Sequence, residues 1–160
     1  NTHGGSIRIY ASIKGQRKIE KIVSKIMQEE KIINLKFLYS FQRKITLSKL
    51  KLMSLLNNLK SKNKSISGIS APSRATTLIN YCGLDKDIID NIFEINGSKK
   101  IGKNIPGTSI PVIKENFTFI KKIDYLLIFS WHIQKQIINT YRRKGYKGKF
   151  IVPLPMPKIL

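Results

Sequence analysis

Apolar and polar positions follow two different patterns along this chain of 160 residues. Through most of the first third, apolar side chains recur every three or four positions, as at Ile19, Ile22 and Ile26. This is the spacing of amphipathic helices, and no glycine or proline interrupts it. The pattern therefore predicts two long helices, over residues 16–31 and 36–60.

A short strand is predicted before these helices. Residues Ser6 to Ser12 alternate apolar and polar side chains and include several residues that favour strands. The pair Gly4–Gly5 stands directly before them and permits a tight turn. The chain is thus expected to open with a strand at residues 6–12.

From residue 63 onward, short apolar runs alternate with helical segments. A loop rich in glycine, lysine and asparagine covers residues 96–109. The alternation predicts an α/β fold, with a mainly parallel sheet of about five strands flanked by helices. One run is apolar enough for a strand that is buried on both faces. That run is 124–130; the other expected strands are 65–70, 91–95, 110–113 and 149–155, and the expected helices are 73–82, 115–121 and 132–144.

The carboxyl ends of these strands are the expected ligand site, because open parallel sheets bind ligands beyond those ends. The first end, at Ala71–Thr76, is also a helix start, where free N–H groups and the helix dipole favour anions. Ser73 could cap this helix, and Arg74 could pair with a phosphate through two hydrogen bonds. A plainer interpretation is that Pro72 and Ser73 only start the helix and that Arg74 is solvated.

Three more candidate ligand-binding residues follow other strand ends. Glu94 ends the second strand, where an acidic side chain could accept a hydrogen bond from a ribose hydroxyl. Trp131 follows the buried strand and could cover a base or sugar, or equally cap the core. His132 comes next and is interpreted as a surface or ligand-side residue rather than a catalyst, because no partner for it can be named.

Several classes of site are not indicated. The chain contains neither a GxGxxG nor a GxxxxGK[ST] motif, and it has no recognisable catalytic triad or pair of carboxylates. One cysteine, Cys82, and two histidines do not form a zinc-ligand pattern. No apolar stretch approaches the roughly 20 residues that span a bilayer, and no signal peptide is visible. These features fit a cytoplasmic protein. Because the chain begins with Asn1 rather than methionine, we also expect it to be a piece of a longer protein.

The net charge of +21 has two interpretations. Basic residues neutralise phosphates, so the charge could indicate a nucleic-acid-binding module. However, 24 of the 30 basic residues are lysines, and they are spread along the whole chain together with abundant isoleucine and asparagine. That composition is typical of an AT-rich coding sequence, and no nucleic-acid recognition motif accompanies it. Nucleic acid is therefore not the expected partner, although the basic module stays an alternative.

Five blocks of the sequence resemble, in order, the motifs of a known enzyme family. The family is the C-terminal domain of the S-adenosylmethionine-dependent sugar C-methyltransferases, which act on nucleotide-linked deoxyhexoses. The resemblance covers nearly the whole chain. The blocks are HGGSIRIY (3–10), GISAPSRATTLINYCGL (68–84), GKNIPGTSIPV (102–112), DYLLIFSWHIQKQII (124–138) and GYKGKFIVPLP (145–155).

The resemblance implies a Rossmann-like domain within a three-part enzyme. A small zinc-binding domain and a catalytic domain that binds S-adenosylmethionine are expected upstream. Residues 1–14 would then be a strand of that catalytic domain, residues 15–62 a helical packing region, and residues 63–160 the substrate-binding domain. This chain has neither a glycine-rich donor loop nor zinc ligands, so it is not expected to methylate alone. Its expected role is to hold the nucleotide sugar and to exclude water.

The same resemblance suggests which residues face the substrate. His3, which is also the one possible catalytic residue, would approach it from the catalytic side with Ser6 and Arg8. The chain departs from the family motifs at Arg74–Ala75, where Lys-Gly is usual, at His132, where Asn is usual, and at Glu94, where Asp is usual. These departures leave open a docking domain with a degenerate pocket. Further candidates on the nucleotide-sugar side are Arg74, Thr76, Thr77, Asn80 and Tyr81.

Overall fold

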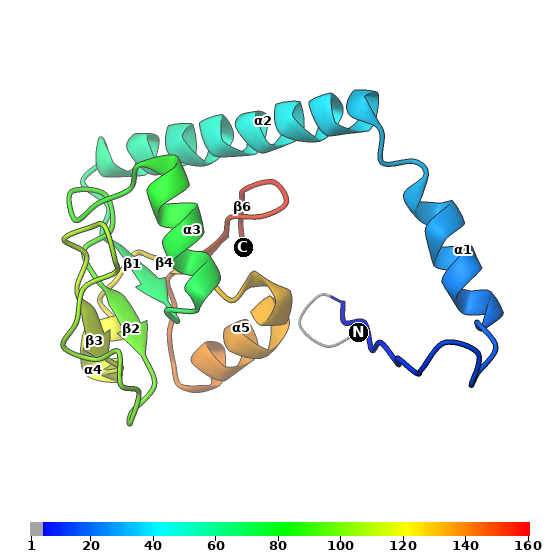
Figure 1. The fold of residues 1–160 in the computed structure, drawn as a ribbon. Coiled ribbons are helices and arrows are strands. Elements are labelled where there is room, and N and C mark those ends of the chain that lie inside the picture. Colours follow the sequence, from blue (N-terminus) through cyan, green and yellow to red (C-terminus); the bar gives the residue numbers. More distant parts are fainter. Residues whose placement is uncertain (1–4) are drawn as a thin grey trace. The chain divides into compact units, whose positions relative to one another are not determined.

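The computed structural model describes residues 5–160, which form helices and one sheet (Figure 1). The chain divides into two compact units, Asn1–Thr46 and Leu47–Leu160. His3 lies outside the described residues. Residues 5–46 contain no buried residue, whereas residues 47–160 contain both buried apolar clusters.

The second unit is built on a six-stranded sheet in the order β3-β2-β1-β4-β5-β6. The first five strands are parallel, and β6 runs antiparallel to β5. The predicted α/β class with a mainly parallel sheet is therefore confirmed. The strands are β1 (Ile66–Ile69), β2 (Ile92–Glu94), β3 (Val112–Lys114), β4 (Tyr125–Ile128), β5 (Lys149–Val152) and β6 (Lys158–Ile159).

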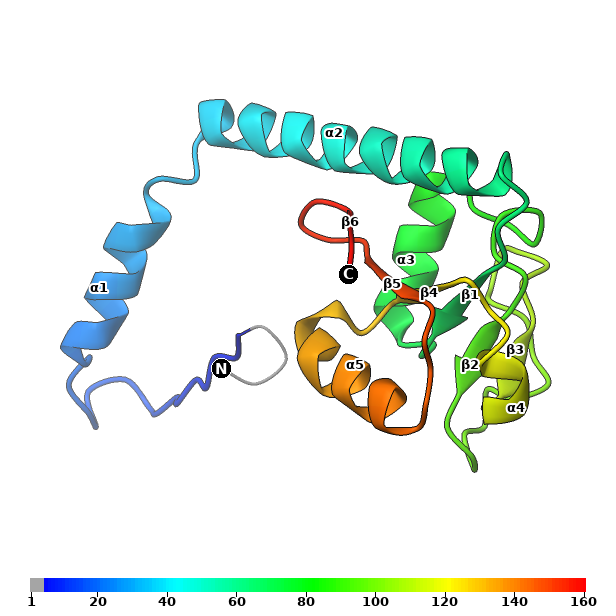
Figure 2. The same ribbon diagram turned by 180° about the vertical axis from the view of Figure 1, so that it is seen from behind.

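Helices cover both faces of this sheet (Figures 1 and 2). One buried cluster joins the sheet to α3 and to the last part of α2, through residues such as Leu56 and Ile79. A second cluster joins the opposite side chains of the strands to α4 and α5, through Ile120 and Tyr141. The helices are α2 (Leu35–Lys60), α3 (Ser73–Cys82), α4 (Phe117–Ile120) and α5 (Gln134–Arg143), with a 3₁₀ turn at Trp131–Ile133 before α5.

The centre of the sheet depends on a glycine. Gly68 pairs with Ile92 on one side and with Leu127 on the other. A Cβ atom at this position would lie 2.7 Å from the ring of Phe129 and 2.8 Å from Ile92 Cγ1. Both neighbours are fully buried, so β1 can pack this closely only with hydrogen at that position.

The amino ends of β1 and β4 are joined by a reciprocal pair of hydrogen bonds. One oxygen of Asp124 accepts from both the backbone N–H (3.0 Å) and the hydroxyl (2.9 Å) of Ser65. The Ser65 hydroxyl in turn accepts from the Asp124 backbone N–H at 2.9 Å. The backbone N–H of Ser65 is the main cause that lowers the pKa of Asp124, with smaller help from its hydroxyl and from Lys64. The end of the sheet opposite the expected ligand site is therefore fixed by local polar contacts.

The first unit contains α1 (Lys21–Glu30) and the start of α2. Both helices were predicted, although α1 begins later than expected. Residues 5–13 have no regular secondary structure within this chain, so the strand expected over Ser6–Ser12 stays a prediction for the longer protein. A strand needs a neighbour for its backbone hydrogen bonds, and no strand in the described part of the chain pairs with this segment. Residues 6–12 alternate apolar and polar side chains but have no neighbouring strand among the described residues.

Candidate functional site

The sheet changes direction between β1 and β4. From β1 the chain passes through α3 to β2 on one side, whereas β4 leads through α5 to β5 on the other side. Ligands of open α/β sheets bind beyond the carboxyl ends of the strands at such a switch point. The two segments that meet there are residues 70–74 and 129–132, which we call the switch-point loops.

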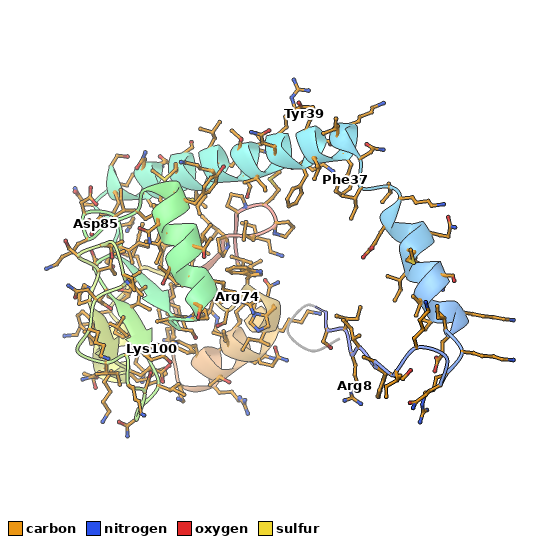
Figure 3. All side chains as sticks on the ribbon, viewed as in Figure 1. Arg8, Phe37, Tyr39, Arg74, Asp85 and Lys100 are labelled. Atoms are coloured by element: carbon orange, nitrogen blue, oxygen red, sulfur yellow. The ribbon has the colours of Figure 1, made fainter. Side chains whose placement is uncertain are left out.

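Three predicted residues come together across the switch-point loops. The Arg74 Nη1 atom lies 3.2 Å from Nδ1 of His132, and the Arg74 Cζ atom lies 5.5 Å from the centroid of the Trp131 ring. All three side chains are half-buried. Figure 3 shows Arg74 at the start of α3. Each residue was predicted separately from its place after a strand, and in the structure the three form one cluster.

Among the described residues, the Arg74 guanidinium has no carboxylate partner. No aspartate or glutamate between residues 5 and 160 forms an ion pair with it, whereas Lys60, Lys64 and Lys144 each pair with an acidic side chain. The ring of Trp131 and the nitrogen of His132 therefore hold a cation without neutralising it. A half-buried cation of this kind is suited to an anionic ligand.

The helix that carries Arg74 starts differently from the prediction. Pro72 is the N-cap residue of α3, and no side chain makes a capping hydrogen bond there. Ser73 is already the first helical residue, so the prediction that Ser73 caps the helix is wrong. Proline favours the extended backbone that a cap position needs, and it takes that position itself. No acidic residue lies in the first turn, so the positive end of the helix dipole is not offset locally.

Glu94 and Lys100 fix the loop between β1 and α3 from the side of β2. Glu94 is 9% exposed, and its two oxygens accept hydrogen bonds from the backbone N–H groups of Ala71 (2.9 Å) and Ile95 (3.2 Å). The Lys100 ammonium donates to the Ala71 carbonyl at 2.6 Å. Glu94 therefore supports the loop, and its contact with a ribose hydroxyl stays a prediction.

Lys100 is a candidate that sequence reasoning missed (Figure 3). Its one signal was its place in the lysine-rich loop at 96–109, which did not distinguish it from Lys99 or Lys103. Only the fold shows that this lysine reaches the loop before α3. The side chain adds a second positive charge next to the turn that leads to Arg74.

Other predicted residues on α3 do not join the cluster. Asn80 donates to the Thr76 carbonyl at 2.8 Å and to the Pro106 carbonyl at 3.0 Å, and it thereby holds the loop that precedes β3. Tyr81 lies beneath Lys49 of α2, 4.7 Å from the ring centroid to the ammonium. Since a helix rises 1.5 Å per residue, they lie about 9 Å and about 10.5 Å further along the axis than Arg74.

The two threonines on α3 have intermediate positions. Thr76 is half-buried and Thr77 is exposed, and both follow Arg74 within one turn. Ser6 and Arg8 belong to the first unit, where both are exposed and Arg8 contacts Tyr10 at 3.4 Å. A role of these four residues in substrate binding stays a prediction.

The residues do not form a metal site or a nucleophile. Across residues 5–160, no group of three histidine, cysteine, aspartate or glutamate side chains could hold a metal ion. Burial raises the pKa of the Cys82 thiol, an effect that Lys49 partly offsets. Among the described residues, none belongs to a helix that is both long and apolar enough to cross a membrane. The chemistry that this cluster supports is the binding of an anion by the guanidinium of Arg74.

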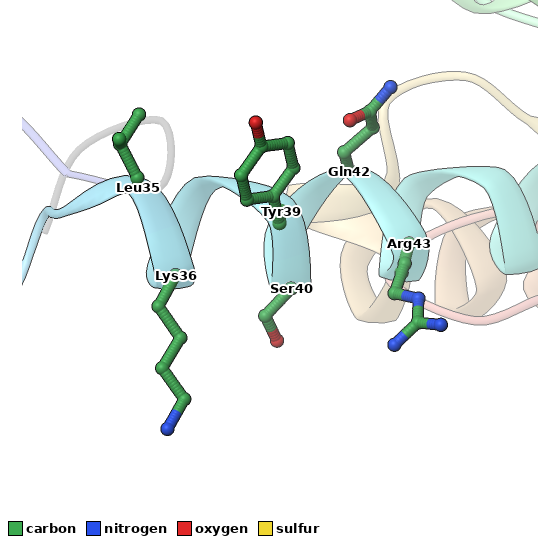
Figure 4. A pocket seen from close by; sticks show the side chains of 6 residues that line it. All are labelled: Leu35, Lys36, Tyr39, Ser40, Gln42 and Arg43. Carbon is green, nitrogen blue, oxygen red and sulfur yellow. The ribbon is translucent and has the colours of Figure 1, made fainter.

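A hollow on α2 lies apart from these residues in the sequence (Figure 4). It is formed by two turns of one helix, so it has no second wall that could enclose a ligand. None of its residues was predicted as a site residue. They are Leu35, Lys36, Tyr39, Ser40, Gln42 and Arg43.

Comparison with known proteins gives two findings. A family model described as C-methyltransferase C-terminal domain matches residues 1–155. A curated protein, C-methyltransferase NovU from Streptomyces niveus, is 25% identical over 167 aligned positions. That alignment includes all of this chain and 39% of the relative, so the chain spans well under half of the relative's length.

Proposed function

Because the chain belongs to the family of C-methyltransferase C-terminal domains, we propose that it binds a nucleotide-linked keto-deoxysugar for an S-adenosylmethionine-dependent C-methyltransferase. The resemblance seen in five sequence blocks is thereby confirmed at the level of the family. That the chain is part of an enzyme belongs to the proposal. The nature of the substrate and the division of work between domains are proposals. They rest on the cluster at the switch-point loops.

One observation carries the assignment of the substrate. Arg74 stands at the carboxyl end of the parallel sheet, half-buried and without an acidic partner among the residues that the structure describes. Nucleotide sugars carry two phosphates, which a guanidinium binds through paired hydrogen bonds. The start of α3 adds a dipole of the same sign. Both features favour the phosphates of the ligand over a neutral sugar.

The methyl donor and the zinc ion are assigned elsewhere in the enzyme. The turn from Ser70 to Ser73 contains no glycine, and residues 5–160 contain no metal-ligand group. These residues therefore fit neither S-adenosylmethionine nor zinc. We propose that both bind in another part of the full-length protein, which also carries the acid–base residues. S-adenosylmethionine, when bound there, supplies the methyl group.

The first unit has a proposed structural role. Its helices and residues 5–13 expose apolar side chains such as Ile7, Ile22 and Phe37. We propose that residues 1–14 add a strand to the catalytic domain and that the helices after them pack on that domain. Residues 63–160 would then close the substrate site, with His3, Ser6 and Arg8 on the catalytic side. The isolated chain would not be active, and its cytoplasmic location stays a prediction.

Protection by ligand tests the proposed function. The full-length protein that contains this chain is heated with nucleoside-diphosphate sugars, and its melting temperature is measured. A ligand at 100 times its Kd should stabilise the folded state by about 2.7 kcal/mol. Arg74→Ala should reduce this protection at the same ligand concentration.

Arg143→Ala is the matched control. Arg143 is an exposed arginine on α5 whose side chain donates a hydrogen bond to the backbone carbonyl of Asn139. Its removal changes the net charge by the same amount and should leave the protection intact. If no nucleotide sugar stabilises the full-length protein, the proposal is wrong, and a docking domain with a degenerate pocket becomes the better interpretation.

A further inference from the structure

The contact between Arg74 and His132 fixes the state of the imidazole ring. The two nitrogens lie 3.2 Å apart. A guanidinium can only donate hydrogen bonds, so Nδ1 of His132 must be the acceptor. The ring is then neutral and carries its proton on Nε2. His132 serves here as an acceptor for a cation, which is a role that an ammonium or a second guanidinium could not take.

Trp131 holds the same guanidinium by its ring. The Arg74 Cζ atom lies 5.5 Å from the ring centroid, within the range of cation–π contacts. The tryptophan and the histidine are neighbours in the 3₁₀ turn that follows β4, so one short segment supplies both contacts. Arginine side chains lose considerable freedom when a ligand orders them. Here two neighbours have already ordered this one.

The other edge of the guanidinium is open. His132 uses Nη1, and Nε and Nη2 of Arg74 have no hydrogen-bond partner in the part of the chain that the structure covers. These two atoms form the edge that binds two oxygens of one phosphate in parallel. The contacts with His132 and Trp131 therefore orient the guanidinium and leave its Nε–Nη2 edge available for a ligand.

We propose that His132 is a positioning residue that holds Arg74 so that its Nε–Nη2 edge binds a phosphate of the substrate's diphosphate. This inference rests on the proposed function and assigns the ligand group that Arg74 binds. His132 acts through Arg74 and does not itself contact the ligand. Trp131 supports the same orientation from the face of the guanidinium.

Two substitutions separate the acceptor atom from the ring. His132→Phe keeps an aromatic ring and removes the acceptor. His132→Asn removes the ring and keeps an acceptor oxygen at the same distance along the side chain as Nδ1. The full-length protein is titrated with uridine diphosphate and thymidine diphosphate, with the corresponding nucleosides as controls that lack phosphate. His132→Phe should weaken binding of the diphosphate about fivefold, the effect of one hydrogen bond. His132→Asn should restore the affinity to within about twofold of the original protein.

A double-mutant cycle tests whether His132 acts through Arg74. Arg74→Ala should weaken diphosphate binding by about 10- to 100-fold, as expected for a charged hydrogen-bonding partner. Adding His132→Phe to Arg74→Ala should cause no further loss. A further fivefold loss in the double variant would show that His132 binds the ligand directly, and the positioning role would be overturned.

A measurement without ligand separates this inference from the proposed function. Nitrogen NMR of Arg74 reports how fast its guanidinium rotates. Rotation should be slow in the original protein and in His132→Asn, and fast in His132→Phe. Equal rotation in all three proteins would overturn the positioning role even if diphosphates bind. Slow rotation that depends on His132, combined with no binding of any diphosphate or of pyrophosphate, would instead overturn the proposed function and the assigned ligand group.

Discussion

The helix α2 has the same apolar pattern in two regions with opposite burial. Leu56 is fully buried against the sheet, whereas Leu38 is 47% exposed. They are 18 residues, or five turns, apart and therefore have the same angular position on the helix. The comparison extends to the two units, because among residues 5–46 no residue is buried, while residues 47–160 contain both apolar clusters. Hydrophobic spacing thus predicts a helix and its apolar face but does not tell what covers that face.

The largest effect is expected from shortening Leu56, with Leu38 as the exposed comparison. Leu56→Ala should lower the free energy of unfolding by about 2–5 kcal/mol, because it leaves a cavity in the core. Leu38→Ala, the matched change on the same face of the helix, should cost less than about 0.5 kcal/mol. Denaturant titration of the chain measures both. Equal losses would mean that the exposed half of α2 is covered in solution by another copy of the chain.

A smaller effect is expected at the crowded centre of the sheet. Gly68→Ala places a methyl group against Phe129 and Ile92, and should destabilise the fold by about 1–3 kcal/mol. Phe129→Leu, combined with it, should recover part of this loss, and thermal unfolding of the two single variants and the double variant measures the coupling. If the losses in unfolding free energy of the two single variants simply add in the double variant, then Gly68 and Phe129 do not pack as closely as the structure shows. No position in residues 5–46 should be as sensitive to one added methyl group.

The smallest effects are expected from substitutions of charged residues, one in each unit. Asp124→Asn should cost no more than about 1 kcal/mol at neutral pH, since its carboxylate is partly exposed. Glu29→Gln breaks the exposed pair of α1, where Lys25 Nζ lies 3.9 Å from Glu29, and should have no measurable effect. Stability measured against pH checks both variants.

The direction of the pH dependence follows from the lowered pKa of Asp124. An unperturbed aspartate titrates near pH 3.8, and the folded protein binds this proton only at lower pH. The stabilisation by Asp124 is therefore complete above about pH 3.8 and is lost as the pH falls through the folded pKa. The difference between the original protein and Asp124→Asn should shrink on acidification. A difference that grows at low pH would contradict this assignment.

Local patterns were sufficient to predict most of the fold. Apolar runs located β1, β2, β4 and β5 to within a few residues, and the helix from Ser73 to Cys82 was predicted at its observed bounds. The antiparallel strand β6 was missed, because the proline-rich stretch before it indicated an end to the sheet. Residues 6–12 form no strand within this chain, since alternation of side chains cannot supply a neighbouring strand.

The candidate site was predictable only in its parts. Strand ends indicated Arg74, Trp131 and His132, because the carboxyl edge of a parallel sheet is where ligands bind. Their mutual contact joins residues 58 positions apart, and no local pattern carries that information. The same holds for Lys100, which reaches Ala71 from a loop 29 positions away. Ser73 was misjudged as a cap, because Pro72 fits that position equally well.

The two-residue strand β6 has a consequence for the behaviour of the chain in concentrated solution. Without it, β5 would present a row of unpaired backbone groups that could recruit a strand from another molecule. With β6 in place, the outermost strand is very short and carries the charge of Lys158, which discourages growth of the sheet into fibrils. The strand β6 thus blunts the β5 edge of the sheet against pairing with another molecule.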